Sequence, residues 1–476
     1  MRRYHRPLGL VVSIFALVTL LAAPVGAASP PVAVSGSSPF AACTIGGPGT
    51  NYVNAEVEPW VAVNPTNARN LIGAWQQDRW SNGGSHGLVA GYSADGGSTW
   101  GETPLPFSAC APSGLAYERA SDPWMSIGPD GTAYTISISF NQSNNDNAVA
   151  TATSVDGGKT WSNPALLKAD TGTTQFFNDK ESVTADPVHA GVAYAVWDRL
   201  QSPNANPYAD LHAHAYTGPS YFAKTTDGGK TWSAAAIIVD TAQNNQTIGN
   251  QIVVDPRNGT LYDVFDLIVS TGSNSDTPHG TNVAFIKSPD GGATWTQPQI
   301  INTLQSVGVP NTRTGDIIPE PAIDSATGRL YVVWQDSRFN GGHYDEIALS
   351  TSGDGGATWS APARVNDATG QSAFTAAVAV NSKGAVGVSY YQYLSQSATA
   401  LPTNYRLKTS SDHGATFGAA TTLKGPFDMT TAPNARGYFV GDYEGLTTIG
   451  TSFRAFFVAT NTGNTANRTD VFTTGT

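Results

Sequence analysis

Glutamate and arginine residues recur in pairs along this chain, each glutamate before an apolar stretch and each arginine after an aromatic one. The pairs are Glu58 with Arg79, Glu181 with Arg199, and Glu320 with Arg338. Guanidinium groups bind carboxylates through paired hydrogen bonds, and carboxyl groups can donate or accept protons in catalysis. If the fold gathers these side chains in one place, they could bind an acidic ligand and carry out acid–base chemistry on it.

The pairs alternate with an octapeptide of the form S-x-D-x-G-x-T-W that occurs six times. The copies lie at residues 93–100, 154–161, 225–232, 288–295, 352–359 and 410–417; the third begins with threonine and the last ends in phenylalanine. Asp-Gly-Gly supplies a side-chain acceptor for turn amides and two residues that tolerate positive φ, which favours a β-hairpin turn. The spacing lacks the ligand count of an EF-hand calcium loop. We therefore interpret these boxes as structural and predict no metal.

The boxes and the strand patterns around them define a repeat with room for four strands. In each repeat an apolar strand, a turn and an aromatic-rich strand lead toward the box, and another strand follows its last residue. Four antiparallel strands per repeat of this length form a propeller blade. The sequence predicts an all-β propeller over residues 56–476, with seven blades favoured and six as the alternative. We expect a strand from residues 29–55, around Val32, Ala33 and Val34, to complete the last blade and close the ring.

The first residues have the pattern of a secretory signal peptide. Three arginines precede an apolar run over residues 8–21, and small residues follow it. We assign residues 1–28 to this signal and predict a secreted, extracellular protein. No second apolar stretch is long enough to span a bilayer.

Composition and charge limit the partners of the chain. The net charge of −11 argues against nucleic acid, because phosphate backbones need clustered lysine and arginine. Cys43 and Cys110 are the two cysteines, and in an oxidising compartment they could either form one bridge or remain free. We expect a monomer without a cofactor.

Repeated S-x-D-x-G-x-T-W hairpins on a propeller resemble those of the non-viral sialidase superfamily and its other Asp-box (BNR-repeat) members. The resemblance covers essentially the whole chain after the signal peptide. It implies that the box turns face away from the ligand, whereas the starts of the innermost strands and the ends of the second strands meet at the central mouth. The residues that this arrangement places at the mouth are Glu58, Asp122, Glu181, Glu320, Asp442, Asp78 with Arg79, Asp198 with Arg199, and Asp336 with Arg338.

The resemblance also implies catalytic roles and a glycan substrate. Sialidases bind the substrate carboxylate with an arginine triad, attack the sugar with a tyrosine that a glutamate activates, and use an aspartate as acid/base. The expected catalytic residues are Asp78, Tyr443, Glu181 and Glu320, and the expected substrate-binding residues are Arg79, Arg199, Arg338 and Asp442. The chain would then be an exo-sialidase-like glycoside hydrolase acting on extracellular glycans.

The sequence departs from this family at the first arginine of the triad. The Arg-Ile-Pro signature that donates it is missing, and E-P-W stands in its place at residues 58–60. Arg79 would have to act as the substitute. A mouth ringed by Glu58, Asp122 and Asp442 would also repel an anionic sugar unless arginines or a cation neutralise it.

Several of these assignments have a structural alternative. The Asp-Arg pairs at strand ends could be repeated salt bridges that brace the rim, and Tyr443 could be a packing residue. His212 and His214, in an insertion over residues 200–220, could bind a metal or substrate, or lie in an exposed loop. For the whole protein the alternative is a non-catalytic propeller that binds carbohydrate or protein, and a lyase on the same scaffold is a third hypothesis.

Overall fold

The structure is a computed structural model that describes residues 1, 28–201, 217–242, 245–269, 281–397 and 399–476. Strands make up nearly all of its regular structure. The helical elements among the described residues are two 3-10 turns, η1 (Arg338–Asn340) and η2 (Met429–Thr431). The predicted all-β class is therefore confirmed. His212, His214 and the predicted signal peptide, apart from its first and last residues, lie outside the described residues.

Four sheets contain four antiparallel strands each, and every strand pairs with the next along the chain. The first sheet contains β10 (Phe176–Ala185), β11 (Ala193–Gln201), β12 (Ser220–Thr225) and β13 (Ala236–Val239). The second contains β14 (Asn245–Val254), β15 (Leu261–Val269), β16 (Thr281–Ser288) and β17 (Gln299–Leu304). The third contains β18 (Glu320–Ile323), β19 (Leu330–Asp336), β20 (Glu346–Ser352) and β21 (Ala363–Arg364). The fourth contains β22 (Ala373–Val380), β23 (Val386–Tyr393), β24 (Pro402–Ser410) and β25 (Thr421–Asp428).

The remaining strands form a twelve-stranded sheet made of three groups. One group contains β2 (Asn51–Val63), β3 (Leu71–Trp80), β4 (Ser85–Ser93) and β5 (Gly101–Leu105). The next contains β6 (Arg119–Ile127), β7 (Ala133–Phe140), β8 (Asn147–Ser154) and β9 (Ala165–Asp170). The last contains β26 (Gly445–Ile449), β27 (Ser452–Thr460), β28 (Thr469–Gly475) and β1 (Val32–Ala33).

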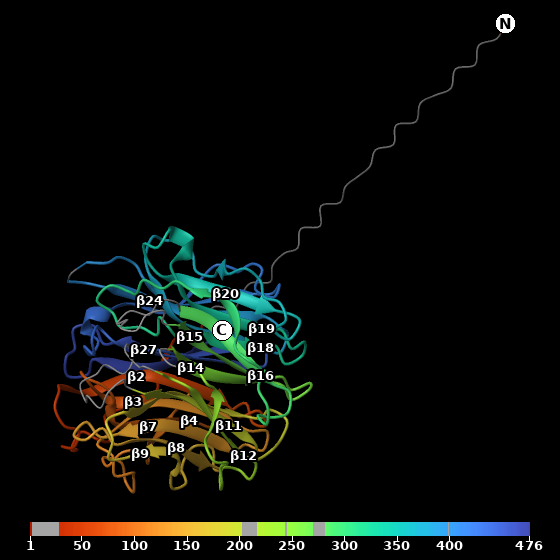
Figure 1. The fold of residues 1–476 in the computed structure, drawn as a ribbon. Coiled ribbons are helices and arrows are strands. Elements are labelled where there is room, and N and C mark those ends of the chain that lie inside the picture. The colour runs from red at the N-terminus through yellow and green to blue at the C-terminus, as the bar shows by residue number, and fades with distance from the viewer. Residues whose placement is uncertain (2–27, 202–216, 243–244, 270–280, 398) are drawn as a thin grey trace.

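Short contacts join these three groups. Single-residue bridges link Ala55 of β2 to Thr469 of β28, and Ser85 of β4 to Ala120 of β6. The N-terminal strand β1 pairs with β28 in antiparallel register. The first and last strands therefore meet, and Figure 1 shows the blue strand β27 beside the orange-red strand β2.

The first strands of the groups surround a common centre. β2 contacts β6, β6 contacts β10, and the contacts continue through β14, β18, β22 and β26 back to β2. All of these strands line one cavity of about 330 Å³, which we call the central tunnel. Among the described residues, hydrogen bonds do not join the sheets into one closed sheet. Sheets that surround a tunnel and contact one another through side chains make a β-propeller.

Each octapeptide forms the turn that its aspartate and hydroxyl residues predict. In the first box Asp95 accepts hydrogen bonds from the Thr99 amide (2.9 Å) and hydroxyl (2.7 Å), and the Gly97 amide donates to the Ser93 hydroxyl (2.9 Å). Equivalent bonds form around Asp156, Asp227, Asp290, Asp354 and Asp412. Hydrogen bonds from the threonine side chain and amide lower the pKa of Asp290 to about 2. The carboxylates of the boxes are thus committed to their own turns.

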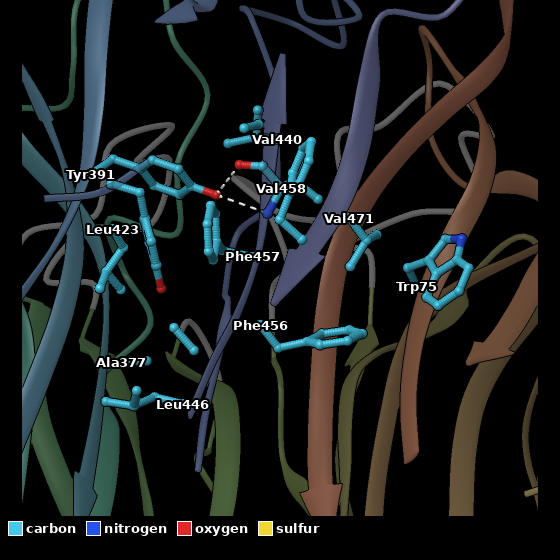
Figure 2. Close-up of a cluster of buried hydrophobic side chains, with 14 of the residues drawn as sticks. Trp75, Ala377, Tyr391, Leu423, Val440, Leu446, Phe456, Phe457, Val458 and Val471 are labelled. Carbon is cyan, nitrogen blue, oxygen red and sulfur yellow. Dashed lines mark hydrogen bonds between the residues drawn. The ribbon is translucent and has the colours of Figure 1, made fainter. Parts of the chain in front are cut away.

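A large buried apolar cluster packs the last strands of the chain against the first. It includes Trp75 on β3, Tyr391 on β23, and Phe456 and Phe457 on β27, and Figure 2 shows these side chains between the sheets. The Tyr391 hydroxyl donates to the Val458 carbonyl (2.6 Å) and accepts from the Val458 amide (3.2 Å). Because this buried hydroxyl is satisfied, the cluster fixes β23 against β27 without an orphaned polar group at that contact.

Cys43 and Cys110, 67 residues apart, form a disulfide that links the N-terminal segment to the region after the first box. Replacing both with serine should lower the free energy of unfolding by about 4 kcal/mol, because the unfolded chain regains the entropy of a long open loop. Urea denaturation measures the loss. A reductant should reproduce most of it in the unmodified protein and leave the serine variant unchanged. Equal urea midpoints for the two proteins would contradict the prediction.

Candidate active site

The innermost strands carry a recurring bulge that positions the residues of the site. The pairing register shifts on β2, β6 and β10 around Glu58, Asp122 and Lys180. All three residues have positive φ, of 52°, 54° and 48° respectively. A bulge re-aims a side chain and releases it from the hydrogen-bonded ladder, and backbone strain of this kind is concentrated at functional sites. The bulges bring side chains from different strands into contact.

Lys180 lies at the centre of a buried ionic cluster. Its Nζ lies 2.8 Å from Oδ2 of Asp442, 3.0 Å from Oδ2 of Asp122 and 3.4 Å from Oε1 of Glu58. The Lys180 side chain is 9% exposed, and each of the three carboxylates is less exposed. The expected convergence of Glu58, Asp122 and Asp442 is therefore observed, and a lysine supplies the neutralising cation.

Two arginines complete the cluster. Arg313, from the connection between β17 and β18, donates from Nη2 to Oδ2 of Asp442 at 2.5 Å. Arg79 donates to Oε1 of Gln76 at 2.6 Å, and Gln76 in turn donates to Glu58. Both guanidinium groups stack on the buried Phe439 ring, 4.8 Å (Arg79) and 4.4 Å (Arg313) from its centroid. The ring holds both cations beside the carboxylates.

The surroundings of the carboxyl groups in the cluster shift their pKa values in different directions. Burial alone would raise the pKa of Asp442, but Arg313 and Lys180 hold that pKa well below its usual range. Burial and the charge of Asp122 raise the pKa of Glu58 instead. The pKa of Lys180 is raised despite its burial, because Asp122, Asp442 and Glu58 surround it. Asp442 is therefore ionised and Lys180 protonated at neutral pH.

A cavity of about 430 Å³, the mouth cavity, opens directly beside this cluster. Its charged lining residues are Lys180, Arg313, Asp316, Arg436 and Asp442. Burial, with the nearby charges of Asp345 and Asp442, raises the pKa of Asp316 to about 6, which is the range of a general acid or base near neutral pH. The cavity thus combines cations, a fixed carboxylate and a titrating carboxyl group.

The residues predicted from sequence divide between this cavity and other places. Asp442 lines the cavity, and Arg79 lies behind it in the cluster. Asp78 does not line it: its carboxylate accepts hydrogen bonds from the Ser38 hydroxyl (2.7 Å) and the Asn54 amide (2.9 Å), and lies 3.2 Å from Nδ1 of His86. Asp78 is placed to fix the N-terminal segment on β3.

Arg199 and Arg338 make local ion pairs and do not line the mouth cavity. Arg199 pairs with Asp170 at 2.5 Å and lies over the Phe176 ring. Arg338 pairs with Asp336 at 2.7 Å. The predicted alternative, an Asp-Arg salt bridge repeated around the rim, is found for Asp336 with Arg338 but not for every pair. The carboxylate next to Arg199, Asp198, accepts from Thr247, Gly249 and Asn250 instead.

Tyr443 and Glu181 line a small buried cavity of about 10 Å³ between the tunnel and the cluster. The Tyr443 hydroxyl donates to the Pro123 carbonyl at 3.1 Å, and its ring packs edge-on against Trp124. Neither carboxylate oxygen of Glu181 has a hydrogen-bond partner in the part of the chain that the structure describes, and burial together with the charge of Asp122 raises the pKa of Glu181 well above the usual value. The space is enough for about one water molecule.

Glu320 lies elsewhere, in the wall of the central tunnel. It does not line the mouth cavity. Its pKa is raised well above the usual value by burial. Glu320 begins the innermost strand β18, and Glu181 lies next to the bulge of the innermost strand β10. The structure nevertheless places the two residues in different cavities.

Sequence reasoning missed Lys180, Arg313 and Asp316. Lys180 occupies in its repeat the position that Glu58 occupies in the first, so alignment of the repeats held a signal for it. Arg313 and Asp316 lie in a connection outside the repeated strands, and no pattern in the sequence marks them. Their position depends on how residues 305–319 pack against Asp442.

Among the residues that the structure describes, no three His, Cys, Asp or Glu side chains form a group able to hold a metal ion. None of the helices in the described part of the chain has the length and apolar character needed to cross a membrane.

The fold is similar to that of several solved structures at low sequence identity. An α-L-arabinanase of Penicillium chrysogenum complexed with arabinobiose has a TM-score of 0.48 and 12% identity, covering 94% of this chain and 98% of that one. A Hadza microbial sialidase has a TM-score of 0.46 and 14% identity, covering 86% and 74%. A polysaccharide lyase, an ulvan lyase, has a TM-score of 0.46 and 10% identity, covering 82% and 79%. No protein-family model matches the chain, and the comparison with curated proteins gives no match.

Proposed function

We propose that this chain is a glycoside hydrolase that acts on an anionic sugar bound in the mouth cavity. The observation that carries the proposal is the set of charges in that cavity, where Lys180, Arg313 and Arg436 accompany Asp316 and Asp442. Cations outnumber carboxylates there, and the pKa of Asp316 near 6 leaves part of its population neutral. A cavity of this kind attracts an anionic ligand although the whole chain has a net charge of −11.

Asp316 is the proposed acid/base of the reaction. Its protonated carboxyl group donates a proton to the glycosidic oxygen while the bond between that oxygen and the sugar breaks. Asp442, kept ionised by Lys180 and Arg313, stabilises the positive charge that develops on the sugar ring. Water then adds to the anomeric carbon and gives its proton to the Asp316 carboxylate, which restores the starting state.

An exo-sialidase-like activity is the finer form of this proposal. Arg313 would bind the substrate carboxylate, a role that the family resemblance gave to Arg199 and Arg338. A tyrosine nucleophile would be Tyr443, with Glu181 as the proton acceptor, because both line one small cavity. Attack would require the Tyr443 hydroxyl to leave the Pro123 carbonyl.

A panel of fluorogenic aryl glycosides carrying a sialic acid, a uronic acid or a neutral sugar tests the proposal. We expect release from an anionic glycoside, and Arg313→Ala should lower its kcat/KM by about tenfold to a thousandfold, because a desolvated charge contact is lost. Arg257→Ala is the matched control, since Arg257 pairs with Asp255 outside the cavity. Equal losses in the two variants, or release of neutral sugars alone, would contradict the proposal.

A non-catalytic glycan-binding protein is the second candidate, and one observation favours it. Asp442 contacts both Lys180 (2.8 Å) and Arg313 (2.5 Å), so its charge is already compensated and less of it remains to stabilise positive charge on a sugar ring. Titration calorimetry with the same anionic sugars separates the candidates. Binding that Arg313→Ala abolishes, without release of the aryl group by the unmodified protein, would establish the binding function.

We also propose that the groups of strands are seven propeller blades, that β1 completes the last of them, and that the protein is secreted as a monomer. The pairing of β1 with β28 and the closed series of contacts between innermost strands support this architecture. The N-terminal sequence of protein recovered from the culture medium tests export, and a product that retains residues 1–28 would contradict the signal peptide.

A further inference from the structure

The central tunnel has a different chemical character from the mouth cavity. Its lining residues follow those of the mouth a few positions further along the chain: Val183 follows Lys180, Glu320 follows Ile318, and Leu446 follows Asp442. Most of them are apolar, and Glu320 is the one charged side chain among the described residues that line it. We propose that the central tunnel binds a small organic ammonium ion between the Glu320 carboxylate and the aromatic rings of Trp60 and Trp124. This site is independent of the proposed glycosidase activity.

Glu320 is the residue that calls for a cationic ligand. It is 4% exposed. Among the described residues, its Oε1 atom has no hydrogen-bond partner and no lysine or arginine lines the tunnel beside it. An unpaired buried carboxylate is costly, so such a group either stays protonated or takes a cation. Burial raises the pKa of Glu320 well above its usual value, which is the behaviour of a carboxyl group that lacks its partner.

Two indole rings in the tunnel wall favour an organic cation. Trp60 and Trp124 stack with their centroids 3.4 Å apart, and both line the tunnel. The Trp60 indole N–H is already bound to the Met125 carbonyl at 3.1 Å, so ring surface is what remains for recognition. Tryptophan faces attract ammonium groups, and an apolar wall does not replace the water shell of a small metal ion. A cavity of about 330 Å³ has the size of a small-molecule site.

Binding should be coupled to a proton. Because the ammonium ion pairs with the ionised form of Glu320, its affinity should rise with pH until the folded pKa of Glu320 is passed. Two other titratable groups interact electrostatically with Glu320. They are Glu444, which precedes β26, and Tyr405 on β24. Burial raises the pKa of both of these groups. Neither is among the described residues that line the tunnel, so Glu320 is the group whose ionisation the ligand would use.

The experiment compares choline with 3,3-dimethyl-1-butanol, its neutral isostere, by titration calorimetry on the full chain. Choline should bind at least about tenfold more tightly than the alcohol, and Glu320→Gln should remove that difference. Asp316→Asn, in the mouth cavity, is the control for a charge change outside the tunnel and should leave choline binding unchanged. If choline binding fails while an anionic glycoside is still cleaved, the tunnel proposal alone is wrong.

The pH dependence of the unmodified protein keeps the proposal testable even if the glutamine variant does not fold. Choline affinity should increase as pH rises, whereas the affinity of the alcohol should stay constant. Equal affinities of choline and the alcohol, or choline binding that weakens as pH rises, would overturn the proposal. Choline binding that Asp316→Asn abolishes would place the cation in the mouth cavity and would also overturn it.

Discussion

Replacing Asp316 with asparagine should lower kcat/KM on an anionic aryl glycoside by about two to four orders of magnitude, because the reaction loses its general acid. The pH profile should change as well. A general acid must be protonated, and the folded pKa of Asp316 is about 6, so the kcat/KM of the unmodified protein should fall as pH rises above that value. The residual activity of the Asp316→Asn variant should not show this fall at alkaline pH. Steady-state rates across the pH range measure both effects.

The exposed Asp240, which caps the local Ala242 amide at 3.2 Å, provides the matched control. Asp240→Asn removes the same charge from the chain without touching the mouth cavity, and it should keep both the rate and the alkaline fall. An Asp316→Asn protein that retains the same alkaline limb would assign the titration to another group. An Asp316→Asn protein as active as the control would remove Asp316 from the mechanism.

Replacing Lys180 with methionine should destabilise the fold by about 3 to 5 kcal/mol, because the carboxylates of Glu58, Asp122 and Asp442 would lose their shared buried cation. The loss should depend on pH. In the unmodified protein the depressed pKa of Asp442 contributes stability that is present above its unfolded pKa and is lost as pH falls. The difference in the free energy of unfolding between the unmodified protein and Lys180→Met should therefore become smaller toward acid pH. Urea denaturation at several pH values measures it.

Lys224 provides the control for the loss of a lysine. Its Nζ donates to the Gly291 carbonyl at 3.1 Å and pairs with no carboxylate of the described residues, so Lys224→Met should cost only about 1 kcal/mol. In the Lys180→Met background, Asp122→Asn should recover part of the stability, because it removes a carboxylate charge that Lys180 pairs with at 3.0 Å in the unmodified protein. A Lys180→Met protein no less stable than Lys224→Met would show that the cluster is not the ionic centre of the fold.

Local sequence patterns predicted much of the fold because they act over a few residues. The boxes around Asp95 and Asp290 bond to their own turns, so their structure requires no distant partner. Repetition then supplies the architecture, since each repeat must bury its apolar strands against the next. The family resemblance, rather than the repeat itself, implied that Glu58, Asp122 and Asp442 meet at the mouth, and these three do converge on Lys180. It also implied the mouth for Glu181 and Glu320, which line two other cavities.

The partners of charged side chains could not be predicted in this way. Arg199 and Arg338 have the residue type and the strand position expected of a substrate clamp, yet each pairs with a nearby aspartate. Arg313 has no place in the repeat and still reaches Asp442, 129 residues further along the chain. An arginine pairs with whichever carboxylate packing brings within a few ångströms, and a repeat does not specify that packing.

The all-β repeat and the box turns follow from the amino-acid sequence alone, since backbone periodicity and side-chain bonds within one turn dictate these features. The sequence does not specify which cations meet the acids of the cluster, which carboxyl group titrates near neutral pH, or that Glu320 lies in the tunnel with no partner for its Oε1 atom among the described residues. Those properties depend on burial and on charges from separate sheets, and both arise only when the sheets pack around the tunnel.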